Sequence, residues 1–237
     1  MIVYGRNAVR EALRGRRGAT VQWILATEPA AREPWLSGRD VRIGVAAELE
    51  RVCGSREHQG VCAELAAYPY VSTGELLAAP APLIVALDEV QDPQNLGAIC
   101  RTAECAGASG VVICERRAAE VTPAVCRASA GAVEHLRIAR ARNLADFLIA
   151  AGRAGCWCYG AAATPASIPH TQPDYAGGVV LVFGAEGHGL RRRVAESCDA
   201  LVALPLRGKI GSLNVSAAAG AILYEVLRQR PALDSTP

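Results

Sequence analysis

The stretch Leu204-Pro-Leu-Arg-Gly-Lys-Ile-Gly-Ser-Leu-Asn-Val-Ser216 decides how the C-terminal half of the chain is interpreted. It is a loop punctuated by glycines, and it leads into a long apolar helix predicted over residues 213–230. Ser212 and Asn214 stand where this helix begins. Ser212 could be a plain N-cap, whereas capping explains Asn214, inside the first turn, less well. The stretch therefore predicts polar groups gathered at a helix start.

Two other loops have the same character, because polar residues and glycines directly follow an apolar strand. They cover Asp92–Arg101 and Phe183–Gly189. In open α/β sheets, ligands bind outside the carboxyl ends of the strands, so we expect the three loops to meet at one site. The glycine spacing of the second loop fits neither the dinucleotide fingerprint nor the phosphate loop.

Strand and helix patterns alternate from residue 83 onward. The continuous apolar run 83–88 is typical of a strand buried on both faces of a parallel sheet. This alternation predicts an α/β fold with helices on both faces of the sheet. The predicted strands are 83–88, 110–114, 156–160, 179–183 and 200–204, and the predicted helices are 96–106, 122–129, 143–152 and 213–230.

The N-terminal part reads as a separate, small α/β unit. A helix is predicted over 3–15 and another over 46–53, with strands at 21–26, 41–45 and 61–65. Prolines bracket residues 67–82, as expected of a linker. We therefore predict a small domain over 1–66, a linker over 67–82 and a larger domain over 83–237.

Composition narrows the possible functions only a little. The net charge of +2 does not by itself indicate nucleic-acid binding. The nine cysteines show no Cys-x-x-Cys spacing, so we expect small buried hydrophobic side chains and no metal site. The start of the chain turns polar at once and no apolar run approaches a membrane span, which predicts a cytoplasmic protein without a signal peptide.

Taken singly, the polar loop residues have ordinary interpretations. Asn95 could cap a turn, Arg101 could be a solvated surface arginine, and Glu186 could cap the following helix turn. Gly97 argues mildly against the ordinary interpretation of Asn95 and Arg101, because a glycine early in a helix usually lets another group approach closely.

Together and in this order, the loops resemble the three signature motifs of the SpoU/TrmH family of RNA ribose 2′-O-methyltransferases. The motifs are residues 92–103, 183–187 and 204–216, and residues 127–132 also fit. Tyr4–Val9 and His58–Gly60 resemble the L30e-like substrate-binding domain of the subgroup that methylates a guanosine in 23S ribosomal RNA.

The resemblance implies a cofactor, a fold and a set of functional residues. It implies a C-terminal α/β-knot domain, a trefoil-knotted parallel sheet that binds S-adenosylmethionine. It also implies a homodimer, in which the first motif of one chain completes the partner's site. The cofactor-binding residues would be Gly184, Leu204 and Leu213, and the catalytic residues Arg101, Asn95, Glu186, Ser212 and Asn214.

The role of Arg101 is open between a general base and an electrostatic clamp on the RNA. A free guanidinium has a pKa above ~12, so a neutral arginine at pH 7 is very costly, which favours the clamp. The same chemistry on transfer RNA or on an antibiotic-resistance site of ribosomal RNA is an alternative. Two rivals are an RNA-binding protein without catalysis and a nucleotide-dependent enzyme. RNA contacts are expected from the basic side chains Arg6, Arg10, Arg14, Arg16 and Arg17.

Overall fold

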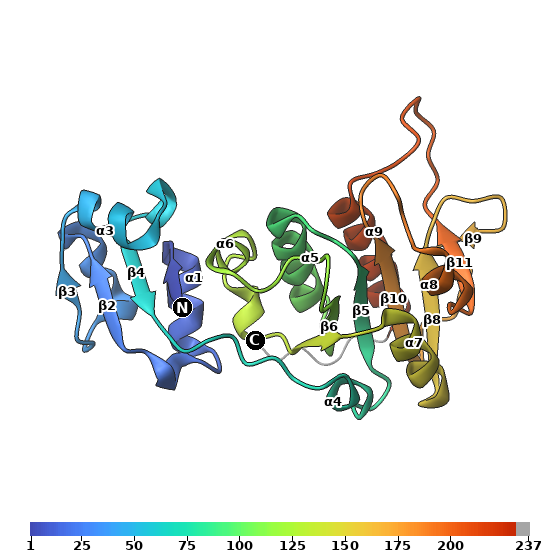
Figure 1. Ribbon diagram of the computed structural model, residues 1–237, viewed down its shortest axis with the longest axis horizontal. Helices are drawn as coiled ribbons and strands as arrows, with labels where there is room; N and C mark the ends of the chain where they lie inside the picture. The colour runs from blue at the N-terminus through green and yellow to red at the C-terminus, as the bar shows by residue number, and fades with distance from the viewer. Residues whose placement is uncertain (231–237) are drawn as a thin grey trace.

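Two sheets lie side by side along the long axis of the molecule (Figure 1). The structure is a computed structural model that describes residues 1–230. The smaller sheet has the strand order β1-β4-β2-β3. Its strands are β1 (Ile2–Tyr4), β2 (Trp23–Ala26), β3 (Arg42–Ile43) and β4 (Val61–Glu64), and its helices are α1 (Arg6–Arg14), α2 (Glu28–Ala31) and α3 (Ala46–Cys53).

The larger sheet consists of seven parallel strands in the order β7-β6-β5-β10-β8-β11-β9. The strands are β5 (Leu83–Asp88), β6 (Gly110–Cys114), β7 (Ile138–Ala141), β8 (Cys156–Ala161), β9 (Ile168–Pro169), β10 (Gly178–Gly184) and β11 (Ala200–Ala203). The helices are α4 (Thr73–Leu77), α5 (Pro93–Cys105), α6 (Pro123–Ala128), α7 (Leu144–Arg153), α8 (Arg192–Glu196) and α9 (Val215–Gln229).

Helices cover both faces of the larger sheet, as predicted. On β5, Val85 and Leu87 join the cluster that contains α5 and α9. The alternate residues Ile84 and Ala86 join the cluster that contains α7. Because successive side chains of a strand point to opposite faces, an unbroken apolar run is what burial on both faces requires.

Several predicted elements differ from the structure. A helix was predicted from residue 3, but Ile2–Tyr4 form β1, which pairs antiparallel with β4, and α1 begins after Gly5. The strands β7 and β9 were missed, because an exposed arginine interrupts the first and the second has only two residues. The last helix begins two residues later than predicted, with Asn214 as its N-cap.

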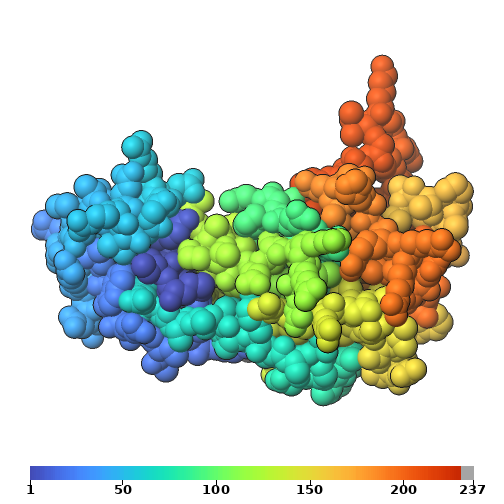
Figure 2. Space-filling model, in the orientation of Figure 1, coloured from blue at the N-terminus to red at the C-terminus, as the bar shows by residue number. Residues whose placement is uncertain are grey.

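Strand β11 enters the sheet between β8 and β9, two strands that are consecutive in the chain. This strand order is compatible with the trefoil knot that the family resemblance implies. The knot itself stays a prediction. The loop between β11 and α9 stands out from the surface (Figure 2). In the described part of the chain, no helix is both long enough and apolar enough to cross a bilayer.

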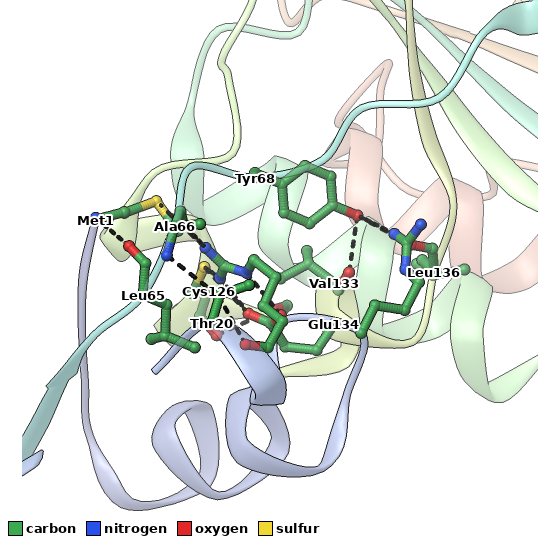
Figure 3. A network of polar contacts seen from close by, with 12 residues as sticks. Met1, Thr20, Leu65, Ala66, Tyr68, Cys126, Val133, Glu134 and Leu136 are labelled. Atoms are coloured by element: carbon green, nitrogen blue, oxygen red, sulfur yellow. Dashed lines mark hydrogen bonds and ion pairs between the residues drawn. The ribbon is translucent and has the colours of Figure 1, made fainter. Parts of the chain in front are cut away.

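A buried ion pair joins the two domains (Figure 3). Arg17 and Glu134 are 2% and 1% exposed, and Arg17 Nε donates to Glu134 Oε2 over 2.9 Å. Arg17 Nη1 also donates to the carbonyl of Ala66, 3.1 Å away. Burial acts to lower the pKa of Arg17, but the Glu134 carboxylate outweighs it and raises that pKa. Arg17 is therefore a structural residue, and its prediction as an RNA contact is wrong.

The segment predicted as a linker also packs between the domains. The Tyr68 hydroxyl donates to the carbonyls of Val133 and Leu136, at 2.8 and 2.9 Å. Val71 pairs with β7 through a parallel bridge to Ala139. Residues 67–82 are thus not a free tether, and the boundaries at 66 and 82 stay predictions.

Replacing Arg17 should strongly destabilise the protein. Arg17→Ala leaves the Glu134 carboxylate buried without its partner, which costs about 3–5 kcal/mol of unfolding free energy. Urea denaturation measures the loss. The matched control is Arg14→Ala on α1, whose side chain is 61% exposed; it should stay within about 0.5 kcal/mol of the wild type. Equal stability of the two variants would contradict this account of the domain contact.

Candidate active site

Side chains from the three motif loops meet in one hydrogen-bonded cluster. Asn95 lies in the first turn of α5, Glu186 in the loop after β10, and Asn214 at the start of α9. Glu186 Oε1 accepts from Asn95 Nδ2 at 2.8 Å and from Asn214 Nδ2 at 2.7 Å. Asn214 Nδ2 also lies 3.0 Å from Asn95 Oδ1. The expectation that the loops meet is therefore confirmed for these three residues.

Local sequence explains how Asn95 and Asn214 reach the cluster. Asp92 caps α5 by accepting from the backbone N–H of Gln94 at 2.9 Å, with Pro93 as the first helical residue. Asn214 caps α9, because its Oδ1 accepts from the N–H of Ser216 at 2.9 Å. The expectation that capping explains Asn214 less well than Ser212 is thus wrong, because Asn214 is the N-cap, and its Nδ2 remains available for Glu186.

The loop that carries Glu186 is a tight hairpin. The N–H of Gly189 donates to the carbonyl of Ala185 at 2.9 Å. A Cβ atom at Gly184 would lie 2.1 Å from the carbonyl carbon of Gly189, so any other residue would force the two arms apart. Gly184 therefore serves close backbone packing at this point.

A buried carboxylate, which sequence reasoning did not assign to the site, anchors the far end of this hairpin. Asp88 ends β5 and is 1% exposed. It accepts from the backbone N–H of Arg191 at 2.8 Å and from Arg191 Nε at 2.7 Å. Burial acts to lower the pKa of Arg191, but contact with Asp88 outweighs it and raises that pKa. The sequence signal was an acidic residue that closes an apolar strand.

A cavity of about 200 Å³ lies at the carboxyl ends of β8, β10 and β11. Its lining includes Gly184, Leu204 and Leu213, the three residues predicted to bind the cofactor, and also Ser212. Apolar side chains form most of the remaining wall, and glycines expose main-chain groups to it. A flat adenine needs apolar walls and nearby main-chain donors, so this lining fits the adenosine part of S-adenosylmethionine.

Arg101 does not join the cluster. It lines a second cavity of about 390 Å³ together with residues of α1 from the smaller domain. Asn95 uses its side-chain amide for Glu186 and Asn214, and not for Arg101. Gly97 does admit a close neighbour, as predicted, but the neighbour is α6: a Cβ atom at Gly97 would lie 2.4 Å from Ala128 Cβ.

Comparisons with known proteins agree with these motifs. Residues 82–224 match the SpoU rRNA Methylase family, and residues 2–71 match the family described as RNA 2′-O ribose methyltransferase substrate binding. A putative TrmH family tRNA/rRNA methyltransferase, YacO of Bacillus subtilis, is 38% identical over 96% of this chain and 95% of its own length.

Solved structures show the same similarity. The AdoMet-bound rRNA methyltransferase from Sinorhizobium meliloti has 29% identity and a TM-score of 0.79, covering 96% of this chain and 86% of that one. The TrmH/SpoU tRNA modifying enzyme of A. aeolicus has 29% identity and a TM-score of 0.58, covering 66% of this chain and 80% of that one.

Removing the Asp88 anchor should weaken cofactor binding. In Asp88→Asn, the amide cannot accept from both donors of Arg191, so the hairpin that lines the cavity at Gly184 and Gly189 loosens. We expect a roughly tenfold weaker Kd for S-adenosylmethionine in calorimetry, equivalent to about 1.4 kcal/mol.

The control is Asp146→Asn, which removes an exposed ion pair to Arg193 (2.9 Å) on the neighbouring α8. It should bind the cofactor like the wild type, because exposed pairs contribute little. Wild-type affinity in Asp88→Asn would show that Asp88 does not hold the hairpin in its binding conformation.

Proposed function

Because the chain belongs to the SpoU RNA methyltransferase family, we propose that it methylates the ribose 2′-hydroxyl of a guanosine in 23S ribosomal RNA. S-adenosylmethionine is the methyl donor of this family. One observation carries the proposal for the site: the cluster of Asn95, Glu186 and Asn214 adjoins the loop residues that line the cavity. As part of the same proposal, the protein acts in the cytoplasm and in ribosomal RNA processing.

The choice of ribosomal RNA is supported by how much of the chain its relatives match. The Sinorhizobium rRNA enzyme covers nearly the whole chain, whereas the A. aeolicus tRNA enzyme covers two thirds of it. The guanosine is supported by the N-terminal segments that resemble the 23S subgroup. These segments come together, because the N–H of Arg6 donates to Gln59 Oε1 at 2.9 Å. Methylation of transfer RNA or of an antibiotic-resistance site remains the alternative.

In this reaction the protein forms no covalent bond with the substrate, and its main task is to position the reacting groups. When bound, S-adenosylmethionine supplies a strongly electrophilic methyl group. The protein must hold the ribose oxygen in line with that methyl group. Such alignment can lower the activation barrier by several kcal/mol. In this proposal Ser212 and Asn214 hold the ribose and the loop, while Glu186 braces Asn214 against Asn95.

Arg101 acts as an electrostatic residue in this proposal. Its guanidinium binds a phosphate of the RNA and stabilises the negative charge that develops on the ribose oxygen. The hydroxyl proton is then released to solvent water, so no neutral arginine, which is very costly at pH 7, is needed to accept it.

We further propose that the protein works as a homodimer in which Arg101 completes the partner's site. The separation of Arg101 from the cluster within one chain supports this arrangement. The exposed Tyr224 and Leu227 on α9 support it too, because apolar side chains on the outer face of a helix favour a contact surface.

Arg101→Ala should keep cofactor binding and lose methyl transfer. The variant should bind S-adenosylmethionine like the wild type, because Arg101 does not line that cavity. Transfer of label to ribosomal RNA should fall by about 10²-fold or more, as for loss of other charge-stabilising groups.

The matched control is Arg153→Ala, an exposed arginine at the end of α7. It should transfer label normally. An active Arg101→Ala variant would refute the role of Arg101. A wild-type protein that binds ribosomal RNA but transfers no label would favour the non-catalytic rival.

Hybrid dimers test whether the site is shared. Arg101→Ala and Gly184→Ala should each be inactive, the second because its new Cβ collides with Gly189. Co-expressed with different affinity tags, the two variants form hybrids that contain one complete site if Arg101 acts across the dimer. Purified hybrids should then show roughly half of the wild-type activity. Inactive hybrids would mean that Arg101 serves the pocket of its own chain.

A further inference from the structure

The second cavity connects the two domains through the side chain of Arg101. Asn7 and Arg10 of α1 line it from the smaller domain. Arg101 and Glu104 of α5 line it from the larger domain, together with His135 and the turn at Ser129–Ala130. A residue of the proposed catalytic set therefore shares one cavity with the domain whose sequence matches a substrate-binding family.

Arg10 is the one member of the predicted set of RNA-contacting arginines that lines this cavity. Arg17 is buried in the domain contact. Arg16 donates to the Leu136 carbonyl at 2.5 Å, and Arg6 pairs with Glu33 at 2.9 Å. Arg14 is exposed but does not belong to the lining.

The charges in the cavity leave Arg101 available for an anion. Two carboxylates, Glu11 and Glu104, also line it. The Glu11 carboxylate contacts Arg10 at 2.8 Å and His135 at 3.0 Å. Burial raises the pKa of Glu11, but these contacts outweigh it and hold that pKa below its usual value. Neither Arg101 nor Glu104 forms an ion pair within residues 1–230, so no carboxylate contacts the Arg101 guanidinium there.

The walls of the cavity are held in place by close domain packing. Gly131 has a φ of +89°, and a Cβ atom there would lie 2.5 Å from Glu11 Cβ. A Cβ atom at Gly15 would lie 2.7 Å from Glu134 Cβ. With the buried pair of Arg17 and Glu134 beside these contacts, α1 is held against the turn at residues 131–134, which itself packs on α5. The cavity is therefore formed before any ligand arrives.

We infer that this cavity binds a single-stranded segment of the substrate RNA next to the methylated ribose, an inference that rests on the proposed function. RNA that is bound by Arg101 lies in or beside this cavity, because Arg101 is part of its wall. Arg10 and Arg101 bind the phosphodiester there, and arginine forks suit phosphate oxygens. The Asn7 amide both donates and accepts, which suits the exposed edge of an unstacked base.

The test compares cavity variants in RNA binding. The probe is a fluorescein-labelled, single-stranded RNA of mixed sequence, followed by fluorescence anisotropy over a range of salt concentrations. Arg10→Ala and Asn7→Ala should each weaken binding roughly tenfold. Of these two variants, only Arg10→Ala removes a phosphate contact. It should therefore reduce the slope of the logarithm of the binding constant against the logarithm of the salt concentration by about 0.7. Arg10→Gln loses the positive charge but keeps a hydrogen-bond donor for Glu11. It should weaken RNA binding as much as Arg10→Ala does, which would exclude misfolding as the cause of the loss.

The control is Arg32→Ala on α2, which makes the same change of charge at a side chain that is 76% exposed and outside the cavity. It should bind the RNA within about twofold of the wild type. Wild-type affinity in all the cavity variants would overturn the inference, and so would an equal loss in Arg32→Ala. Methyl transfer by the wild type is measured in parallel. A wild-type protein that transfers no methyl group refutes the proposed function, whereas an active one with unaffected cavity variants refutes only this inference.

Discussion

The carboxylate of Glu186 is the group on which the geometry of the site depends. Two amides, from Asn95 and Asn214, donate to one of its oxygens. These amides belong to segments 119 residues apart in the chain, and Glu186 lies between them in sequence. Hydrogen bonds to an ionised acceptor are stronger than those between neutral groups, so this contact can fix three flexible loops relative to one another. The same hydrogen bonds hold the cavity walls at Gly184 and Leu213 in place, because each of these residues lies within two residues of the cluster.

Glu186 is exposed, and a buried carboxylate on the other side of the hairpin, that of Asp88, anchors the loop that carries it. Asp88 ends β5, just before the segment that carries Asn95, and it binds Arg191 just after the hairpin. One strand end thus positions both the first and the second motif. The Asp88 carboxylate is buried, and Arg191, whose side chain is 45% exposed, satisfies its charge and its hydrogen bonds. The domain contact differs in this respect, because both Arg17 and Glu134 are buried there.

Sequence reasoning succeeded where a local pattern determines the structure. The strands 83–88 and 110–114 and the helix 46–53 have the predicted bounds, because apolar runs and helical periodicity are local signals. The family and its cofactor were identified from three loops that keep a characteristic order of residues. The N-terminal strand β1 was lost because three residues carry too little pattern to distinguish a strand from a helix start.

What failed depended on contacts between distant residues. Neither composition nor spacing could show that Arg17 faces Glu134, since the two lie 117 positions apart. Among five arginines in one short stretch, the buried one has no distinguishing neighbour in sequence. The role of Asp88 was hidden for the same reason, because its partner Arg191 lies 103 residues away. A charged residue becomes structural or functional only through its partner, and a pattern in the sequence does not name that partner.

The geometry of helix α5 supports the proposal that a second chain completes the site. Asn95 and Arg101 both belong to this helix, six residues apart. At about 100° per residue, their side chains leave the helix on faces about 120° apart. The face of Asn95 is buried against the motif loops, while the face of Arg101 opens into the cavity beside α1. A straight helix cannot turn both faces toward one pocket. This separation supports the proposal that Arg101 meets a ribose held by a second copy, with the RNA following the cavity that Arg101 shares with the smaller domain.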